Sequence, residues 1–347
     1  MSSQRPFAAA LIAALSAAAL AGAPAPARAQ GQLVVYCSVL VDWCNLMATE
    51  FERTSGVKVT IAQKGSGETF AQIRAEASNP RGDIWWGGTG DPHLQAAEAG
   101  FSEEYRSPSL TQLHPWAQRQ AQQSGYRTVG IYAGALGFAY NTEQLAAKKL
   151  AAPRCWSDLV TPPYRGEIQM SNPASSGTAY TAVATLTQLM GEDQAFAYLK
   201  KLHQNISQYT RSGPAPARNA ARGETAVGIM FLHDAVAEAI EGFPLKVAAP
   251  CEGTGYEIGS MSLIKGARNL DNAKKWYEFA LSPGGQSTGA RAKSYQVPSN
   301  VNAAVPPQAP KLSEIKLIDY DFAKYGASAE RKRLIERWEK EVGNQPK

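Results

Sequence analysis

The segment from Asn172 to Thr178 places small hydroxyl residues and a glycine directly before a helical sequence pattern. Ser175, Ser176 and Thr178 surround Gly177 in this segment. Backbone N–H groups are free at the start of a helix, and the helix dipole adds partial positive charge there. The segment therefore predicts binding of a phosphate or carboxylate group, and an ordinary N-cap is the simpler alternative.

Three other hydroxyl residues follow expected strands and could face the same ligand. Ser38 ends the first strand, and Ser66 lies in a Gly-Ser-Gly turn before a helix. Thr89 follows a glycine pair that would let a ligand approach the backbone, although such turns are common. The alternative for Ser66 is a capped turn, and no Gly-Lys-Ser/Thr follows it to make a nucleotide-binding loop. Because ligands of open parallel sheets bind beyond the carboxyl ends of strands, we expect these residues to meet.

His233 and Asp234 follow an apolar run that ends at Phe231, and Glu257 directly precedes another such run. Imidazole and carboxylate groups at strand ends can hydrogen-bond the hydroxyls of a polyol, or they could bind a metal ion. For the histidine taken alone, a structural role is the simpler alternative. The pair nevertheless predicts a second polar region of the same site.

Nucleophilic catalysis is not expected. No Gly-x-Ser-x-Gly elbow is present. Ser176, His233 and Asp234 could be drawn as a triad, but adjacent His and Asp side chains at a strand end diverge, so the carboxylate cannot easily orient the imidazole. We therefore predict a binding protein and not an enzyme. We expect no cofactor and assign no residue as catalytic or as a metal ligand.

Strand-like and helix-like patterns alternate along the chain and would position these residues. The expected strands cover 33–36, 57–61, 84–86, 129–140, 168–170, 227–231 and 258–264. The expected helices include 46–51, 70–77, 176–190, 196–202, 271–281 and 334–342. This order predicts a mainly parallel sheet with helices on both faces. The glycine-containing run 129–140 could cross between lobes, and 297–310 has the composition of a connector.

Residues 1–29 have the pattern of a signal peptide. Arg5 precedes an apolar run, and Ala27-Arg28-Ala29 forms a small-x-small cleavage site. The run is shorter than the about 20 residues that a membrane span needs, and an uncleaved anchor is the alternative. We expect an exported protein that begins at Gln30 and is soluble after cleavage.

The length and charge of the remaining chain, 30–347, indicate two lobes and a small ligand. Single hydrophobic cores stop growing at about 250–300 residues, so this chain is long for one core. The full chain has a formal net charge of +5, part of which leaves with Arg5 and Arg28. The remaining basic residues are scattered, whereas a nucleic-acid groove needs a clustered basic stripe. We therefore expect no nucleic-acid partner.

Four cysteines lie in the exported part, and an even number in an exported chain indicates disulfides. Three pairings are possible, and we favour Cys37–Cys44 and Cys155–Cys251. The first would close a short loop. The second would close a loop of roughly 95 residues, where the chain-entropy account gives about 4–5 kcal/mol.

Several segments together resemble the periplasmic solute-binding proteins of ABC importers, in the type-two branch that includes the ferric-ion-binding proteins. The segments that carry the resemblance are 33–38, 82–88, 136–142, 172–178, 226–229 and 296–300. The resemblance covers nearly the whole exported chain. It implies the two-lobed α/β type II periplasmic-binding-protein fold, each lobe having a mainly parallel sheet flanked by helices, with a ligand cleft between. The first lobe would comprise 30–135 and 256–302, and the second 136–255 and 303–347.

The ferric branch of this family binds iron through two adjacent tyrosines after the strand that matches 226–231. This chain has Leu232, His233 and Asp234 there, and no Tyr-Tyr pair anywhere. The resemblance therefore does not extend to an iron site. Ser176-Gly177-Thr178 matches the place where the ferric proteins hold a helper phosphate.

The chain is more similar to members of the family that bind hexose phosphates. In those proteins a His-Asp pair and a later Glu contact sugar hydroxyls, while serines and amides hold the phosphate. The resemblance implies a monomeric periplasmic protein that delivers an organic phosphate to an inner-membrane permease. A phosphonate, a phosphoglycerate or a metal ion as ligand, and a secreted hydrolase, are the alternatives. The predicted ligand-binding residues are Ser38, Ser66, Thr89, Ser175, Ser176, Gly177, Thr178, His233, Asp234 and Glu257.

Overall fold

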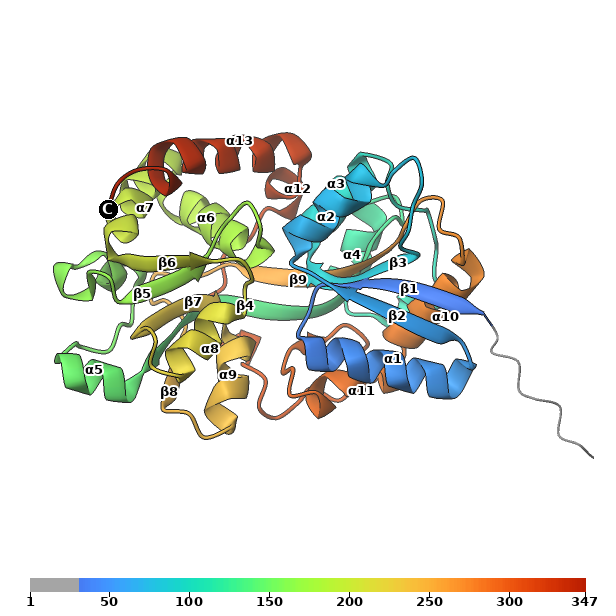
Figure 1. Ribbon diagram of the computed structural model, residues 1–347, viewed down its shortest axis with the longest axis horizontal. Coiled ribbons are helices and arrows are strands. Elements are labelled where there is room, and N and C mark those ends of the chain that lie inside the picture. Colours follow the sequence, from blue (N-terminus) through green and yellow to red (C-terminus); the bar gives the residue numbers. More distant parts are fainter. Residues whose placement is uncertain (1–30) are drawn as a thin grey trace, which may run out of the picture.

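Strand β4, Val129–Asn141, runs through the middle of the molecule and belongs to both halves of one large sheet (Figure 1). The structure is a computed structural model that describes residues 31–347. Near its start β4 pairs with β9, Tyr256–Leu263, and near its end with β7, Val227–Phe231. The run predicted to cross between lobes therefore does so. The predicted signal peptide, residues 1–29, lies outside the described residues.

Parallel strands form the two ends of the sheet, and antiparallel pairs join them in the middle. Strand β1 pairs in parallel with β2 and β3, and β5 pairs in parallel with β6 and β7. The order is β2-β1-β3-β9-β4-β7-β5-β6, with β8 and β10 both pairing with β4. The remaining strands are β1 Gln32–Cys37, β2 Lys58–Gln63, β3 Ile84–Thr89, β5 Ile168–Ser171, β6 Ile206–Thr210, β8 Leu245–Ala248 and β10 Val297–Pro298. The predicted parallel sheets are confirmed at both ends.

The two ends of the sheet run in opposite directions. The pairs β3–β9, β9–β4 and β4–β7 are all antiparallel, so three reversals separate β3 from β7. The carboxyl ends of β1, β2 and β3 therefore point toward the second half, and those of β5, β6 and β7 point toward the first. As a consequence, the loops that follow both sets of strands converge at the centre of the molecule.

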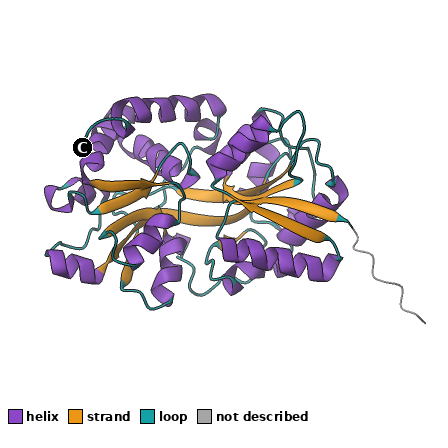
Figure 2. Ribbon diagram, in the orientation of Figure 1, coloured by secondary structure: helices purple, strands orange, loops and turns teal. Residues whose placement is uncertain are grey.

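Helices cover both faces of the sheet (Figure 2). Helix α6 is buried along most of its length, from Gly177 to Thr187, and it ends before Gly191. The helices are α1 Val41–Ser55, α2 Ser66–Ala75, α3 Gly90–Glu98, α4 Pro115–Gln123, α5 Thr142–Lys148, α6 Gly177–Met190, α7 Glu192–Asn205, α8 Ala215–Ala221, α9 Leu232–Ile240, α10 Leu270–Leu281, α11 Pro283–Arg291, α12 Phe322–Tyr325 and α13 Ser328–Trp338. The connector expected at 297–310 begins with strand β10, which pairs with β4.

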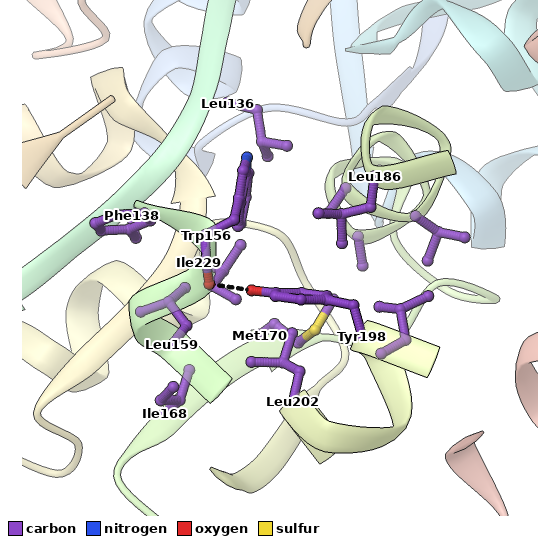
Figure 3. Close-up of a cluster of buried hydrophobic side chains, with 14 of the residues drawn as sticks. Leu136, Phe138, Trp156, Leu159, Ile168, Met170, Leu186, Tyr198, Leu202 and Ile229 are labelled. Atoms are coloured by element: carbon purple, nitrogen blue, oxygen red, sulfur yellow. Dashed lines mark hydrogen bonds between the residues drawn. The ribbon is translucent and has the colours of Figure 1, made fainter. Parts of the chain in front are cut away.

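The two largest hydrophobic clusters of the described residues support the division into two lobes. One contains residues of β1, α1, β3 and α10, with Trp86 and Trp276 at its centre. The other surrounds Trp156 and includes Tyr198, whose hydroxyl donates to the Trp156 carbonyl at 2.6 Å (Figure 3). Helix α13 belongs to this second core through Leu334 and Trp338. The residue boundaries of the lobes stay a prediction.

Both favoured disulfides are present. Cys37 bonds to Cys44 and Cys155 bonds to Cys251, across sequence separations of 7 and 96 residues. The second bond joins the start of the second lobe to the segment that leads into β9. Among the described residues, no helix is long and apolar enough to cross a membrane.

The two disulfides should differ in how much they stabilise the protein. Loop-closure entropy predicts that replacing Cys155 and Cys251 by serine lowers the free energy of unfolding by about 4–5 kcal/mol, against about 2–3 kcal/mol for Cys37 and Cys44. Chemical denaturation of the two double variants measures the difference. A larger loss for the Cys37/Cys44 variant would contradict the loop-length argument.

Candidate functional site

A cavity of about 270 Å³ lies where the strand-end loops of the two lobes meet. Nine of the ten residues predicted to bind the ligand line it. They are Ser38, Ser66, Thr89, Ser176, Gly177, Thr178, His233, Asp234 and Glu257. Ser175 does not line this cavity, and its hydroxyl donates to the Arg211 carbonyl at 2.9 Å. The Ser175 side chain thus joins two loops, and its role in ligand binding stays a prediction.

Five helices begin at this cavity, and none of the five has a side-chain cap. Helices α1, α2, α3, α6 and α9 start beside the lining residues Leu40, Ser66, Thr89, Gly177 and Phe231. The first N–H groups of a helix have no partner within the helix, and each start carries partial positive charge. The cavity therefore collects donors and positive potential from both lobes, which suits a buried anion.

Hydroxyl groups add donors at the start of α6. Ser171 donates to the Ser176 hydroxyl at 2.9 Å, which leaves the Ser176 proton available for a ligand. The Thr178 hydroxyl has no hydrogen-bond partner among residues 31–347, although the side chain is largely buried. Opposite them, the hydroxyls of Ser66 and Thr89 lie 3.3 Å apart. These four side chains form the end of the cavity that is suited to an anion.

The starts of α2 and α6 meet across the cleft, so the structure is closed. A Cβ at Gly177 would overlap the Thr89 hydroxyl, and a Cβ at Gly67 would lie 2.8 Å from the Ala174 carbonyl oxygen. Glycine is therefore required for this close approach of the lobes. An ion pair between Glu68 and Arg211 joins the two sides at the rim.

Four buried polar side chains line the opposite end of the cavity: His233, Asp234, Glu257 and Gln296. The His233 Nε2 atom lies 3.6 Å from Asp234 Oδ1 and 3.7 Å from Glu257 Oε1, which is too long for a hydrogen bond. None of these side chains hydrogen-bonds another described residue, and His233 Nδ1 and Gln296 Oε1 are buried without a partner. Such groups are costly to bury unless something completes their hydrogen bonds.

Strand β4 supports this polar end because it has a glycine beneath the imidazole. A Cβ at Gly134 would lie 2.5 Å from His233 Nδ1. Gly134 also pairs with Glu257 across the β4–β9 ladder. The absence of a side chain at 134 therefore gives the His233 ring its space.

Burial sets the charge of these groups. It lowers the pKa of His233 to about 3, so the imidazole is neutral at neutral pH and can both donate and accept. Burial raises the pKa of Asp234 to about 7, although Arg218 acts in the opposite direction. Burial also raises the pKa of Glu257 well above its ordinary value, and the Asp234 carboxylate adds to this effect. Both carboxyl groups can thus carry a proton and donate, or lose it and accept.

Sequence reasoning missed several lining residues, of which Arg211, Arg218, Tyr132 and Gln296 matter most. The Arg218 side chain forms no ion pair or hydrogen bond with a described residue, and its charge acts on Asp234 in the cavity. Apolar and polar residues alternate in Ile206–Thr210, and Gly213-Pro214 follows. This pattern is typical of a strand followed by a turn, so it could have indicated that Arg211 lies in a strand-end loop. Nothing local in the sequence indicates Tyr132 or Gln296.

The metal and hydrolase alternatives have little support in this geometry. Within 31–347, the one group of three metal-type side chains close enough to share an ion is Cys155, Cys251 and Glu252, and its cysteines form a disulfide. The Ser176 hydroxyl accepts a hydrogen bond from Ser171, and among the described residues no hydrogen bond joins it to His233.

A two-lobed α/β protein that encloses a polar cavity between its lobes is a ligand-binding protein of the periplasmic type. The chain belongs to the family of bacterial extracellular solute-binding proteins, which its residues 89–325 match.

Two solved structures agree with this assignment, and a third shares the fold. The periplasmic binding protein AfuA from Actinobacillus pleuropneumoniae, with exogenous fructose-6-phosphate bound, is 53% identical; the match covers 91% of this chain and 100% of AfuA, with a TM-score of 0.89. The periplasmic binding protein P5PA is 41% identical over 90% of this chain and 100% of its own, with a TM-score of 0.88. Iron-bound HitA from Pseudomonas aeruginosa is 20% identical over 88% of this chain and 98% of its own, with a TM-score of 0.74, and so shares the fold alone.

Replacing Gly177 by alanine should prevent full closure without unfolding the protein. The added methyl group would meet Thr89 and Ser66 only when the lobes approach each other. Small-angle scattering is expected to show a larger radius of gyration than for the wild type, with an unchanged melting temperature. Gly284→Ala is the matched control, because a Cβ there meets only a Ser282 oxygen at 3.9 Å. Equal radii for both variants would contradict the closed arrangement of the two helix starts.

Proposed function

We propose that this protein binds an organic phosphate, in particular a hexose phosphate, in the cavity between its lobes and delivers it unchanged to an inner-membrane permease of an ABC importer. The observation that carries the proposal is that one cavity between the lobes has two chemically different ends. Ser66, Thr89 and the start of α6 form one end, and His233, Asp234 and Glu257 form the other.

The first end favours a phosphate because it offers many donors and few fixed charges. Phosphate oxygens accept several hydrogen bonds at once, and the free N–H groups of α2 and α6 and the hydroxyls of Ser176 and Thr178 can supply them. Hydrogen bonds to a charged group contribute about 1.5–3 kcal/mol each. Arg211 and Arg218, which also line the cavity, add positive potential.

The second end favours hydroxyl groups because its side chains need both donors and acceptors. A neutral imidazole, two carboxyl groups and the Gln296 amide can each exchange hydrogen bonds with a sugar hydroxyl. A ligand with an apolar tail would leave these buried groups without partners. The AfuA structure, which carries fructose-6-phosphate and is 53% identical to this chain, supports the same ligand class.

Location and oligomeric state follow from this role and are part of the proposal. Export to the periplasm through a signal peptide in 1–29, release as a soluble monomer and docking to the permease in the closed state complete the transport cycle. Hinged closure of the lobes is the general mechanism by which such proteins trap a ligand.

A panel of ligands tests the proposed function directly. We expect fructose 6-phosphate or glucose 6-phosphate to raise the melting temperature and to bind in calorimetry, whereas free hexoses, dicarboxylates and ferric citrate do not. A ligand at 100 times its dissociation constant stabilises the folded state by about 2.7 kcal/mol. Stabilisation by ferric citrate alone would support a metal transporter and contradict the proposal.

Substitutions at the two ends should separate the two halves of the ligand. Asp234→Asn and His233→Ala should weaken sugar-phosphate binding by roughly tenfold to a hundredfold and leave inorganic phosphate binding nearly unchanged, since an unsatisfied buried partner costs about 1–3 kcal/mol.

The matched variant at the other end is Thr178→Val, which removes a hydroxyl while keeping the side-chain shape. It should weaken the binding of sugar phosphate and inorganic phosphate by similar factors. Calorimetry on the three variants measures both ligands. Equal losses for both ligands in Asp234→Asn would disprove the assignment of the second end to the sugar.

A further inference from the structure

Asp91 and Arg331 form a buried charged pair between the lobes, outside the ligand cavity. Asp91 lies in the first turn of α3, two residues after Thr89, and Arg331 lies on α13 of the second core. The two residues are only 3% and 5% exposed. Among residues 31–347, Asp91 Oδ1 and Arg331 Nη1 have no hydrogen-bond partner, and the two side chains form no ion pair although their charges interact. The mechanism described above uses neither of them.

Arg331 also contacts both flanks of the loop that leads into α6. Its Nη2 donates to the Pro173 carbonyl at 3.4 Å. Its guanidinium lies over the Tyr180 ring, 4.3 Å from the centroid, and the Tyr180 hydroxyl donates to the Tyr325 carbonyl at 2.6 Å. Pro173 and Tyr180 stand on either side of Ser176–Thr178. The guanidinium thus lies behind the anion end of the cavity.

Other buried polar atoms near this pair also lack partners. They belong to Gln95, one turn after Asp91 on α3, and to Thr185 and Tyr320 of the second lobe. Tyr320 and Thr185 lie together, since a Cβ at Gly255 would contact both. Both lobes therefore contribute polar groups to this region, and their hydrogen bonds are incomplete within the protein.

We propose that Arg331 is a positioning residue of the anion site, which holds the 172–178 loop from behind and compensates the charge of Asp91 when the lobes close. The identity of the anion rests on the function proposed above, and the coupling between Asp91 and Arg331 does not. Opening the lobes gives Asp91 access to water. Closing them removes that water, and a buried carboxylate without a counter-charge is strongly destabilising.

The titration of Asp91 gives this coupling a pH dependence. The groups that face Asp91 are Arg331 on α13, Tyr180 on α6, Tyr320, and Glu257 on β9. Burial raises the pKa of Asp91 to about 6, and Arg331 opposes the rise. When the lobes are open, Asp91 is solvated and has its ordinary, lower pKa. At a pH between that value and about 6, closure of the lobes is therefore accompanied by binding of a proton to Asp91. Closure is therefore easier below this window and carries its full desolvation cost above it.

The test is a double-mutant cycle of Asp91→Asn, Arg331→Met and the double variant, with fructose 6-phosphate and inorganic phosphate as probes at pH 5 and pH 8. At pH 8, Arg331→Met alone should weaken binding by roughly tenfold to a hundredfold, because it leaves Asp91 buried and unpaired. The double variant should recover most of this loss. At pH 5 the loss in Arg331→Met should shrink, because Asp91 takes up a proton.

Arg331→Lys and Asp91→Asn serve as controls. Lysine keeps the charge and should retain most of the affinity, which distinguishes compensation of Asp91 from simple packing of α13. In the Asp91→Asn background the effect of Arg331→Met should be the same at pH 5 and pH 8. A double variant as weak as Arg331→Met, or an Arg331→Met loss that does not depend on pH, would overturn the inference.

The same cycle on ligand-free protein separates this inference from the proposed function. If the wild type binds no phosphate compound, the proposed function fails, but the melting temperatures of the four proteins still report the coupling. Arg331→Met should lower the melting temperature at pH 8, and adding Asp91→Asn should restore it. Additive effects of the two substitutions would contradict the coupling, whatever the ligand.

Discussion

A protein that encloses an anion between two lobes removes it from water and must replace the lost hydration. For the phosphate proposed here, the replacement would come mainly from the backbone, because α1, α2, α3, α6 and α9 all begin at the cavity without side-chain caps. N–H groups at helix starts provide donors without the desolvation cost of a buried lysine or arginine. This requirement explains why small residues, Gly67 and Gly177, stand where the lobes touch, since a side chain there would separate the donors from the ligand.

The direction of the strands meets this requirement. In a sheet that is parallel throughout, all carboxyl ends lie on one edge. In this protein β9 and β4 reverse the direction between the two parallel groups, so both sets of strand ends face the centre. Loops after β1, β2 and β3 and loops after β5, β6 and β7 therefore supply one site together. The antiparallel pairs in the middle of the sheet therefore determine where the cavity lies.

The sequence predicted most of the helices and strands for reasons that are local. Nine of the ten residues that it predicted to bind the ligand line the cavity. Strand ends followed by Gly, Ser and Thr are visible without knowledge of the fold, which is why Ser66, Thr89 and Ser176–Thr178 were identified. Ser175 lies outside the cavity lining for a local reason too, because one residue along a turn decides whether a hydroxyl faces the cavity or another loop. Tyr132 and Gln296 could not be predicted in the same way. They reach the cavity through the pairing of β4 with β10, which brings together residues far apart in the chain.

The continuity of β4 has a consequence for how the protein moves and unfolds. A single strand of 13 residues contributes to the ladders of both lobes, and β9 runs beside it. The hinge is therefore a hydrogen-bonded ribbon and not a flexible linker. Opening of the lobes must therefore be spread over many backbone dihedral angles as small changes of twist. Its energetic cost rises with the opening angle between the lobes. Separating the lobes would require breaking these backbone hydrogen bonds, so the two hydrophobic cores are mechanically linked through β4.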